Sequence, residues 1–313
     1  MSGDGHSVGC GASLLCFIHM KVNAVFEGGG VRGVALAGAA AGAMDLGLEF
    51  DQCVGTSAGA LVSSLLAAGF GSEDLSESIC RIQWPELLRP VRGSRLPLLG
   101  RHLALLSRRG IYDSRRLEEV WGEMLAEQGV RSFGDLRPDS LGIVVTDLSH
   151  SRGVLLPEGL SAYGYDPDRF PVARALRMSA AVPFLFTPVR LRDRINGDVV
   201  VMADGAMAAN YPAGIVRKNH PVLGFRLVLD DTGHDARHLK VRGPLTLARS
   251  VVTAGIRARY SLPRQPEPGV SVVQVPVRND LDFDMSGDQA RAVFDRARSA
   301  ATEQLPVLIP ELV

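Results

Sequence analysis

Hydrophobic residues along this chain fall in short β-rich runs that alternate with longer helical patterns. The run Val22 to Phe26 ends at glycines and predicts a buried strand, and the pattern from about Val31 to Leu46 predicts a helix after it. A second short run, Glu49 to Val54, leads into the apolar helical segment Ala60 to Leu66. This strand–helix–strand–helix order predicts a parallel sheet with helices on its faces.

The clearest helical periodicity runs from Ser114 to about Gln128. Its apolar residues recur three or four positions apart and form one stripe, which consists of Leu117, Val120, Trp121, Met124 and Leu125. Asp113 or Ser114 can cap this helix, and Gly129 ends it.

The remaining pattern completes an α/β chain. We predict further strands at residues 141–146, 199–203, 222–229 and 270–277, and further helices at residues 171–179, 245–259 and 287–304. Ser286 and Gln289 form a capping box for the last helix. Because no linker interrupts the pattern, we expect one domain over residues 20–313, preceded by a disordered extension over residues 1–19.

The composition predicts a full hydrophobic core, and the balanced charge gives no indication of a partner bound through net charge. Hydrophobic residues make up 46% of the 313 positions, and 34 basic residues balance 34 acidic ones, which gives no argument for nucleic-acid binding. The cysteines Cys10, Cys16, Cys53 and Cys80 have neither metal nor redox spacing and indicate a reduced, intracellular protein. No segment reaches the roughly 18 apolar residues of a spanning helix, and no signal peptide is recognisable, so we expect a cytoplasmic protein.

Residues 81–116 differ in character from the rest of the chain. Nine arginines stand there against Glu86 and Asp113, interleaved with leucines and broken by prolines. We expect an irregular, arginine-rich cap over this stretch. Two interpretations stay open: a solvated charged face, or a surface that makes peripheral contact with anionic lipid.

The most informative motif is Gly55-Thr56-Ser57-Ala58-Gly59, between the predicted strand and the apolar helix. A serine in that position matches a nucleophile elbow, where flanking glycines permit a sharp turn that lifts the hydroxyl out above a sheet. Ser57 could instead be an ordinary helix N-cap.

A second motif can stabilise the negative charge that forms when a serine attacks an ester. Gly28-Gly29-Gly30-Val31-Arg32-Gly33 follows the first strand and opens a helix, so its backbone N–H groups are candidate oxyanion donors. Gly29 and Gly30 are the first choices, and the Ala58 amide is a third. Arg32 adds positive charge at the same helix end.

The base that activates Ser57 has two kinds of candidate. Asp204 ends a predicted strand and is followed by Gly205 and Ala206, so its carboxylate can lie beside the elbow. His234 and His238 follow another strand but lack a supporting motif. Asp204 could also be only a turn residue, and we interpret Asp147 as a structural strand-end residue rather than a second base.

Taken in order, these three motifs resemble the patatin-like phospholipase family. Gly28 to Gly33, Gly55 to Gly59 and Asp204-Gly205-Ala206 carry the likeness, which covers roughly residues 22 to 216. Further runs similar to those of the family are Gly110-Ile111-Tyr112-Asp113, Val145-Thr146-Asp147-Leu148, Ser179-Ala180-Ala181-Val182-Pro183 and Asn210-Tyr211-Pro212.

The resemblance implies a three-layer α/β/α sandwich with a mainly parallel central sheet, related to the α/β hydrolases. It implies a Ser57–Asp204 dyad without histidine and an oxyanion hole from Gly28, Gly29, Gly30, Arg32 and Gly33. It also implies hydrolysis of acyl esters in phospholipids or related lipids with no metal or organic cofactor. Ala206 stands where glycine is common, a variation that the family also uses.

Two other function classes stay open at this point. Gly28 to Gly33 also fits the dinucleotide-binding fingerprint of an oxidoreductase, and Glu49 and Asp51 fall near the ribose-binding spacing, although Arg32 would crowd the pyrophosphate. A non-catalytic lipid-binding module is the second alternative.

Overall fold

The computed structural model describes residues 19–91, 110–229, 243, 246–247, 250–251, 254, 267–278 and 282–312. The strands are β1 (Met20–Phe26), β2 (Leu48–Thr56), β3 (Gly110–Tyr112), β4 (Leu141–Asp147), β5 (Arg152–Leu156), β6 (Phe184–Phe186), β7 (Val189–Arg192), β8 (Val199–Asp204), β9 (Val222–Leu229) and β10 (Val270–Val277). The α-helices are α1 (Gly33–Asp45), α2 (Ala58–Ala67), α3 (Ser72–Cys80), α4 (Trp84–Leu87), α6 (Arg115–Glu127), α7 (Val172–Ala180), α8 (Ala206–Ala209) and α10 (Gly287–Leu312). Short 3-10 helices are η1 (Gly30–Arg32), η2 (Phe133–Asp135) and η3 (Glu158–Tyr163).

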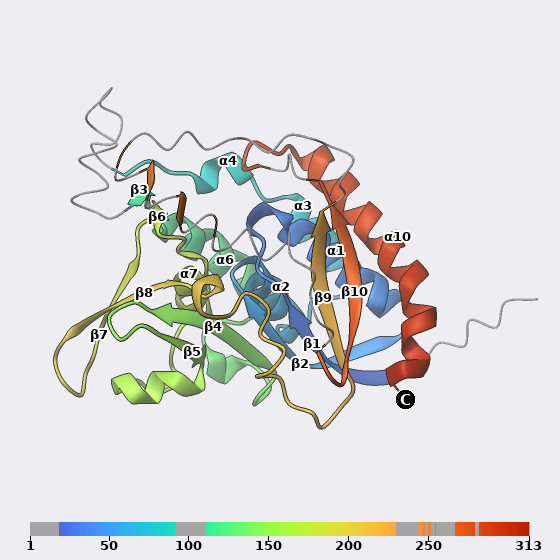
Figure 1. The fold of residues 1–313 in the computed structure, drawn as a ribbon, viewed down its shortest axis with the longest axis horizontal. Coiled ribbons are helices and arrows are strands. Elements are labelled where there is room, and N and C mark those ends of the chain that lie inside the picture. The colour runs from blue at the N-terminus through green and yellow to red at the C-terminus, as the bar shows by residue number, and fades with distance from the viewer. Residues whose placement is uncertain are drawn as a thin grey trace, which may run out of the picture.

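A mainly parallel sheet forms the centre of the fold (Figure 1). Its strand order is β10-β9-β1-β2-β4-β8-β7, with β5 paired to β4. The pairs from β10 to β4 are parallel, whereas β8 pairs antiparallel with both β4 and β7. This confirms the predicted α/β class with a mainly parallel central sheet flanked by helices.

The sheet is covered on its two faces by different parts of the chain. On β1, Val22, Ala24 and Phe26 belong to the large core cluster, to which α1, α2, α7 and α10 contribute their apolar residues. Val25, one position out of phase, belongs to a smaller cluster with Val54 and Ala213. This alternation is what a strand buried on both faces produces.

Most predicted elements are found where the pattern placed them. β9 and β10 keep their predicted bounds, and Leu117, Trp121, Met124 and Leu125 of the α6 stripe are buried. The predicted capping box forms, because the Ser286 amide donates to Gln289 Oε1 at 2.8 Å and the Gln289 amide donates to Ser286 Oγ at 3.2 Å. Most of the predicted helix 245–259 lies outside the described residues.

Other elements differ from the prediction. The last helix continues past residue 304 to Leu312 in spite of Pro306 and Pro310, because Leu305 and Ile309 remain buried against the core. The strands β3, β5, β6 and β7 and the helices α3, α4 and α8 are absent from the prediction. These elements are short or lack strong periodicity, so whether they form depends on the segments with which they pair or pack.

The glycine- and alanine-rich sequence of α1 allows close packing against α10. Every residue from Gly33 to Ala43 is buried. A side chain on Gly38 would overlap the Phe294 backbone carbonyl of α10, and one on Gly42 would overlap the Arg298 carbonyl. Figure 1 shows α10 running beside α1 and β10.

Replacing Gly38 with alanine is expected to lower the free energy of unfolding by about 1–3 kcal/mol, because the added methyl group forces the two helices apart. Urea denaturation followed by circular dichroism measures the effect. Gly122→Ala in α6 is the matched control, since its methyl group would meet Ala173 Cβ at an ordinary 3.4 Å. Equal stability of Gly38→Ala and wild type would contradict the close packing.

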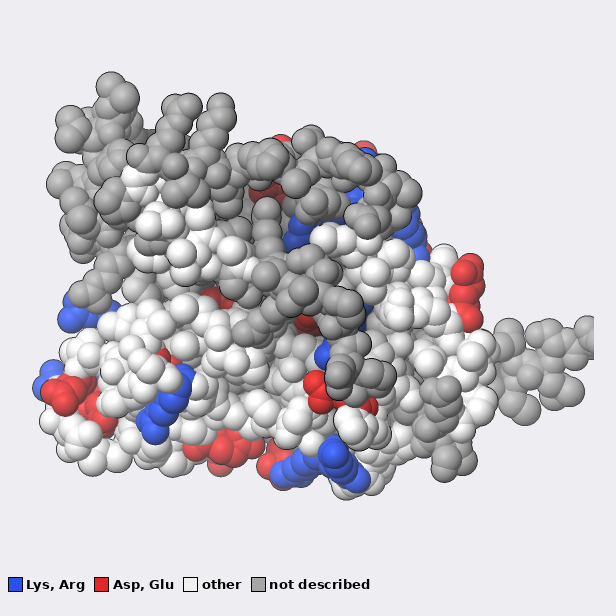
Figure 2. Space-filling view, viewed as in Figure 1, with Lys and Arg blue, Asp and Glu red and all other residues white. Residues whose placement is uncertain are grey.

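Charges on the surface are mixed in sign. On the face seen in Figure 2, basic and acidic side chains lie next to each other along the lower edge, in keeping with zero net charge. In the described part of the chain, no helix combines the length and the apolar character needed to cross a bilayer.

The predicted arginine-rich cap is described only at its two ends, 81–91 and 110–116. Pro90 forms an isolated bridge with Tyr112, which joins these ends. Arg81 pairs with Glu127 at 2.7 Å, and Arg115 pairs with Asp113 at 2.8 Å. Residues 92–109 lie outside the described residues, and with them most of the predicted arginine–leucine surface.

Candidate active site

Ser57 occupies a sharp turn between β2 and α2. Its backbone angles are φ 54° and ψ −118°, a conformation that L-residues other than glycine rarely adopt. Such a conformation costs on the order of 1–3 kcal/mol and persists only where the surroundings hold it. Here the Ser57 amide donates to Ser179 Oγ at 2.8 Å, and Ser179 Oγ donates to the Val144 carbonyl at 2.6 Å.

The glycines on either side of Ser57 are required by close backbone approaches. A side chain on Gly55 would overlap the Gly59 carbonyl, and one on Gly59 would overlap the Phe26 carbonyl of β1. The turn therefore brings the start of α2 against the carboxyl end of β1. This is the local structure that the Gly55–Gly59 motif predicts.

Asp204 ends β8 and lies beside the turn. Its strand pairs with β4 so that Asp204 stands opposite Val145, and its amide donates to the Ala181 carbonyl at 3.1 Å. The carboxylate is buried, with 1% of the residue exposed, and Oδ1 accepts the Ala206 amide at 2.7 Å.

Burial raises the pKa of Asp204 from 3.8 to about 6. Hydrogen bonds from the Ala206 amide and from the Ser57 side chain oppose that rise by favouring the charged form. The structure therefore brings Ser57 and Asp204 together, although 146 intervening residues separate them in the chain. Residues 57 and 204 are both almost fully buried, at 6% and 1% exposed.

The histidines of the described residues are occupied elsewhere. His150 Nδ1 lies 2.6 Å from Asp147 Oδ2, His220 lies 3.7 Å from Asp51, and His19 lies 3.9 Å from Glu49. Within the described residues, the side chains that hydrogen-bond to Ser57 are Ser179 and Asp204. His234 and His238, the alternative bases, lie outside the described residues.

Asp147 belongs to a separate buried cluster. Its carboxylate accepts the Tyr163 hydroxyl at 2.7 Å and the amides of Ser149 and His150. Burial acts to raise the pKa of Asp147, but the hydrogen bonds from Tyr163 and His150 outweigh it and lower the pKa on balance. This carboxylate is thus ionised and fully engaged.

The glycine loop presents only some of its predicted amides to the site. The Gly28 amide donates to the Asn210 carbonyl at 2.9 Å, and the Gly33 amide donates to carbonyls of η1. Gly29, Gly30 and Ala58 stand at the beginnings of η1 and α2, where the first amides have no partner within the helix. Gly30 also has a positive φ of 60°.

An apolar cavity of about 130 Å³ opens beside Ser57. Gly30, Gly33 and Ala58 line it at the Ser57 end. Its apolar walls are formed by Leu61, Val62, Ile79, Trp84, Leu87, Leu117, Trp121, Ala180, Val182, Leu185, Phe186 and Phe283. Trp121 and Leu117 belong to the α6 stripe, so that stripe serves the site as well as the core.

Comparison with known proteins identifies the family. A family model described as patatin-like phospholipase matches residues 24–217. The chain belongs to the patatin-like phospholipase family. Family membership supports lipid acyl hydrolysis in general, and it lends no support to the dinucleotide-binding alternative.

Individual proteins are also similar to this chain. The chain is 37% identical over 211 residues to YqhO of Bacillus subtilis strain 168, covering 66% of this chain and 72% of YqhO. It is 22% identical over 196 residues to R571 of Acanthamoeba polyphaga mimivirus, covering 61% and 59%. The crystal structure of VipD from Legionella pneumophila covers 93% of this chain and 67% of VipD with a TM-score of 0.52; at 14% identity it shows a shared fold alone.

Three residues of this candidate site were not assigned roles from the sequence. Ser179 holds the Ser57 amide, Asn210 holds the Gly28 amide, and buried Glu27 accepts the Asn210 side chain at 3.1 Å and the Leu227 amide at 2.9 Å. Ser179 and Asn210 lie in sequence runs similar to those of the family, and this similarity was the sequence signal that could have identified them. Their contacts join segments distant in sequence, so no local pattern reveals them.

Proposed function

We propose that the protein is a serine lipid acyl hydrolase that cleaves fatty-acyl esters of phospholipids or related lipids through Ser57 and Asp204. One observation carries the proposal: a serine in a positive-φ turn hydrogen-bonds to a buried carboxylate whose pKa is raised to about 6. A carboxylate with that pKa is ionised at neutral pH yet basic enough to accept a proton.

In this mechanism, Ser57 Oγ attacks the acyl carbonyl while Asp204 accepts the hydroxyl proton. The tetrahedral intermediate collapses, and Asp204 returns the proton to the departing alcohol. Asp204 then takes a proton from water as the water attacks the acyl-Ser57 ester, and it returns this proton to Ser57 Oγ as the fatty acid leaves. The chain is returned to its starting state after both steps.

The amides of Gly29, Gly30 and Ala58 are the donors we assign to the oxyanion. They lie at helix beginnings, where the peptide dipoles favour negative charge. Gly28 supports this loop instead of donating, because its amide already binds the Asn210 carbonyl. Arg32 ends η1 and Gly33 begins α1; the Arg32 amide donates to the Gly29 carbonyl at 3.3 Å and the Gly33 amide to carbonyls of η1, so these two residues support the loop.

The apolar cavity beside Ser57 is the site we assign to the acyl chain. Its wall of leucine, valine and aromatic side chains suits a fatty-acyl group, and Ser57 stands at one end. A phospholipase A or lysophospholipase type of ester cleavage, with peripheral contact to a membrane surface, is consistent with this arrangement.

The test is to incubate the purified protein with phosphatidylcholine vesicles and with a short-chain p-nitrophenyl ester. We expect release of fatty acid and of p-nitrophenol, and covalent labelling by a fluorophosphonate on the peptide that contains Ser57. A protein that binds the vesicles but neither hydrolyses them nor reacts with the fluorophosphonate would be a non-catalytic lipid-binding module.

The pH dependence of the reaction follows from Asp204. Because only the ionised carboxylate accepts the Ser57 proton, kcat/KM should rise about tenfold per pH unit below pH 6 and level off above it. The pH profile of kcat/KM is measured from hydrolysis of the p-nitrophenyl ester in well-buffered solutions. A rate that does not change between pH 5 and 7, on either side of about 6, would argue against Asp204 as the base.

A further inference from the structure

An arginine-lined recess lies close to the apolar cavity, because adjacent residues of the same segments line the two. The recess has a volume of about 690 Å³, within the range of small-molecule sites. Phe186 and Leu117 line the cavity, whereas the neighbouring Thr187 and Glu118 line the recess. Figure 1 shows β6, α6 and α7 gathered in this part of the molecule.

Two ion pairs in the recess satisfy both of its carboxylates. Arg115 Nη2 lies 2.8 Å from Asp113 Oδ2, and Arg177 Nη1 donates to Glu118 Oε2 at 2.9 Å. Burial acts to raise the pKa of Asp113, but hydrogen bonds from Arg115 and the charge of Arg177 lower it on balance, so it stays ionised.

Arg177 is held in a fixed orientation. Its Nε donates to Ser114 Oγ at 2.8 Å, and its side chain is only 16% exposed. These bonds use Nε and Nη1, and the described residues offer no acceptor to Nη2. A fixed guanidinium with a free edge is pre-organised for an anion, because little rotamer entropy remains to be lost on binding.

Arg174 and Arg190 also line the recess, and no described carboxylate pairs with either. Arg174 lies on α7 one turn before Arg177, with its guanidinium 5.6 Å from the centroid of the Phe170 ring. Arg190 lies on the exposed side of β7. With both carboxylates already paired, these two arginines leave the recess with an excess charge of about +2.

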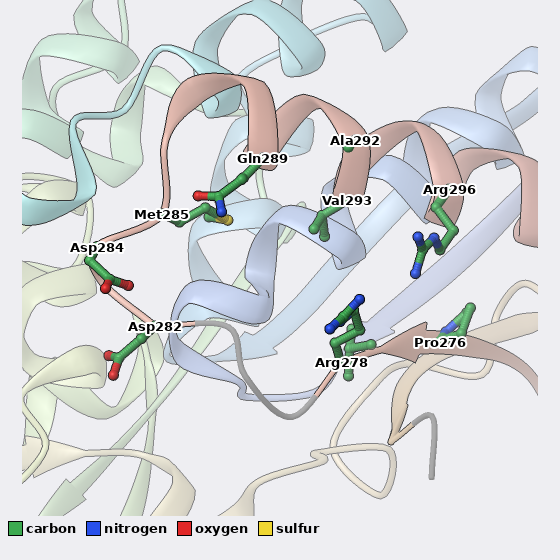
Figure 3. Close-up of a pocket in the computed structure, with 10 residues that line it drawn as sticks. Pro276, Arg278, Asp282, Asp284, Met285, Gln289, Ala292, Val293 and Arg296 are labelled. Atoms are coloured by element: carbon green, nitrogen blue, oxygen red, sulfur yellow. The ribbon is translucent and has the colours of Figure 1, made fainter. Parts of the chain in front are cut away.

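A second charged cleft has no excess of positive charge. It has a volume of about 330 Å³ and lies between the end of β10 and the beginning of α10. In Figure 3, Arg278 and Arg296 point into the same space, while Asp282 and Asp284 lie on the loop before α10. Two positive and two negative side chains balance there, so of these two clefts among the described residues the recess is the one with an excess that an anion would satisfy.

We propose that the recess formed by Arg174, Arg177 and Arg190 binds a ligand that carries a phosphate group. A phosphate monoester at neutral pH carries between one and two negative charges, which matches the excess, and guanidinium groups bind its oxygens through paired N–H donors. The phosphate can belong to a soluble small molecule or to a lipid headgroup. This site goes beyond the proposed esterase function and does not depend on it.

The experiment measures binding with a Ser57→Ala protein, so that no lipid is hydrolysed. Glycerol 3-phosphate and inorganic phosphate are titrated by calorimetry, and vesicles of phosphatidylcholine with or without phosphatidic acid are tested by co-sedimentation. The variants are Arg174→Gln and Arg190→Gln. Arg192→Gln is the matched control, because Arg192 is exposed on the same side of β7 but does not line the recess.

Each recess variant is expected to weaken binding about tenfold, the loss typical of one hydrogen bond to a charged group, while Arg192→Gln leaves it unchanged. Binding of glycerol 3-phosphate identifies a soluble ligand, and binding only of vesicles that contain phosphatidic acid identifies a lipid headgroup; both support the site. Absence of binding to every probe, or an equal loss in Arg192→Gln, would overturn it.

Discussion

Ser57→Ala is expected to lower turnover of phospholipid and of p-nitrophenyl ester by at least about 10⁴-fold. Alanine removes the nucleophilic oxygen but leaves the cavity and the loop amides in place, so lipid can still bind while no acyl-enzyme can form. Fluorophosphonate labelling should disappear together with the release of fatty acid.

The matched control for this variant is Ser63→Ala, on the same helix α2. Ser63 is fully buried, and its hydroxyl has no hydrogen-bond partner among the described residues, so its loss should leave activity and fold intact. The circular dichroism spectra and melting temperatures of both variants should resemble those of wild type. Undiminished turnover in folded Ser57→Ala would place the nucleophile elsewhere.

Asp204→Asn is expected to reduce kcat/KM by about 10²–10⁴-fold, the usual contribution of a general base. The asparagine side chain has nearly the same shape, and its oxygen can still accept the Ala206 amide. It cannot take the Ser57 proton. The ester-hydrolysis assay and the pH profile measure this, since the residual rate should no longer depend on a group with a pKa of about 6.

The same substitution should stabilise the fold above pH 6. The pKa of Asp204 is about 6 in the folded chain, against about 3.9 for an unfolded aspartate. Between these values the folded state binds more protons, so the stability of wild type falls as pH rises, and above pH 6 a constant cost of about 3 kcal/mol remains. Asp204→Asn removes this cost. The variant should therefore have a higher free energy of unfolding in urea than wild type above pH 6, and this difference should disappear as the pH falls from about 6 to 3.8.

Asp147→Asn is a control whose effect on the free energy of unfolding should have the opposite sign. The pKa of Asp147 is lowered in the folded chain, so the ionised carboxylate stabilises the fold, and its loss should destabilise the protein at neutral pH.

Wild-type activity in Asp204→Asn, combined with loss of activity in a His234 or His238 variant, would reassign the base to a histidine.

Several features of this protein follow from short stretches of sequence. The α6 stripe, the runs of β9 and β10 and the Ser286–Gln289 capping box were predictable, because they depend on residues only a few positions apart. The turn at Ser57 was predictable for the same reason, since Gly55 and Gly59 are required within a few residues of it.

Other features depend on contacts that no local pattern encodes. The strands β5, β6 and β7 form because partners exist for them, and α10 continues past Pro306 because Leu305 and Ile309 are buried. Which loop amides remain available depends on Asn210, far along the chain.

The sequence by itself determined the family, the order of the central elements and the identity of the two candidate residues, because motifs and periodicities are properties of neighbouring positions. Tertiary structure alone decided that antiparallel pairing of β8 with β4 brings Asp204 to Ser57, that burial raises its pKa, and that Arg174, Arg177 and Arg190 line one recess. These outcomes depend on the packing of elements that are far apart in the chain, and burial and proximity exist only once that packing has formed.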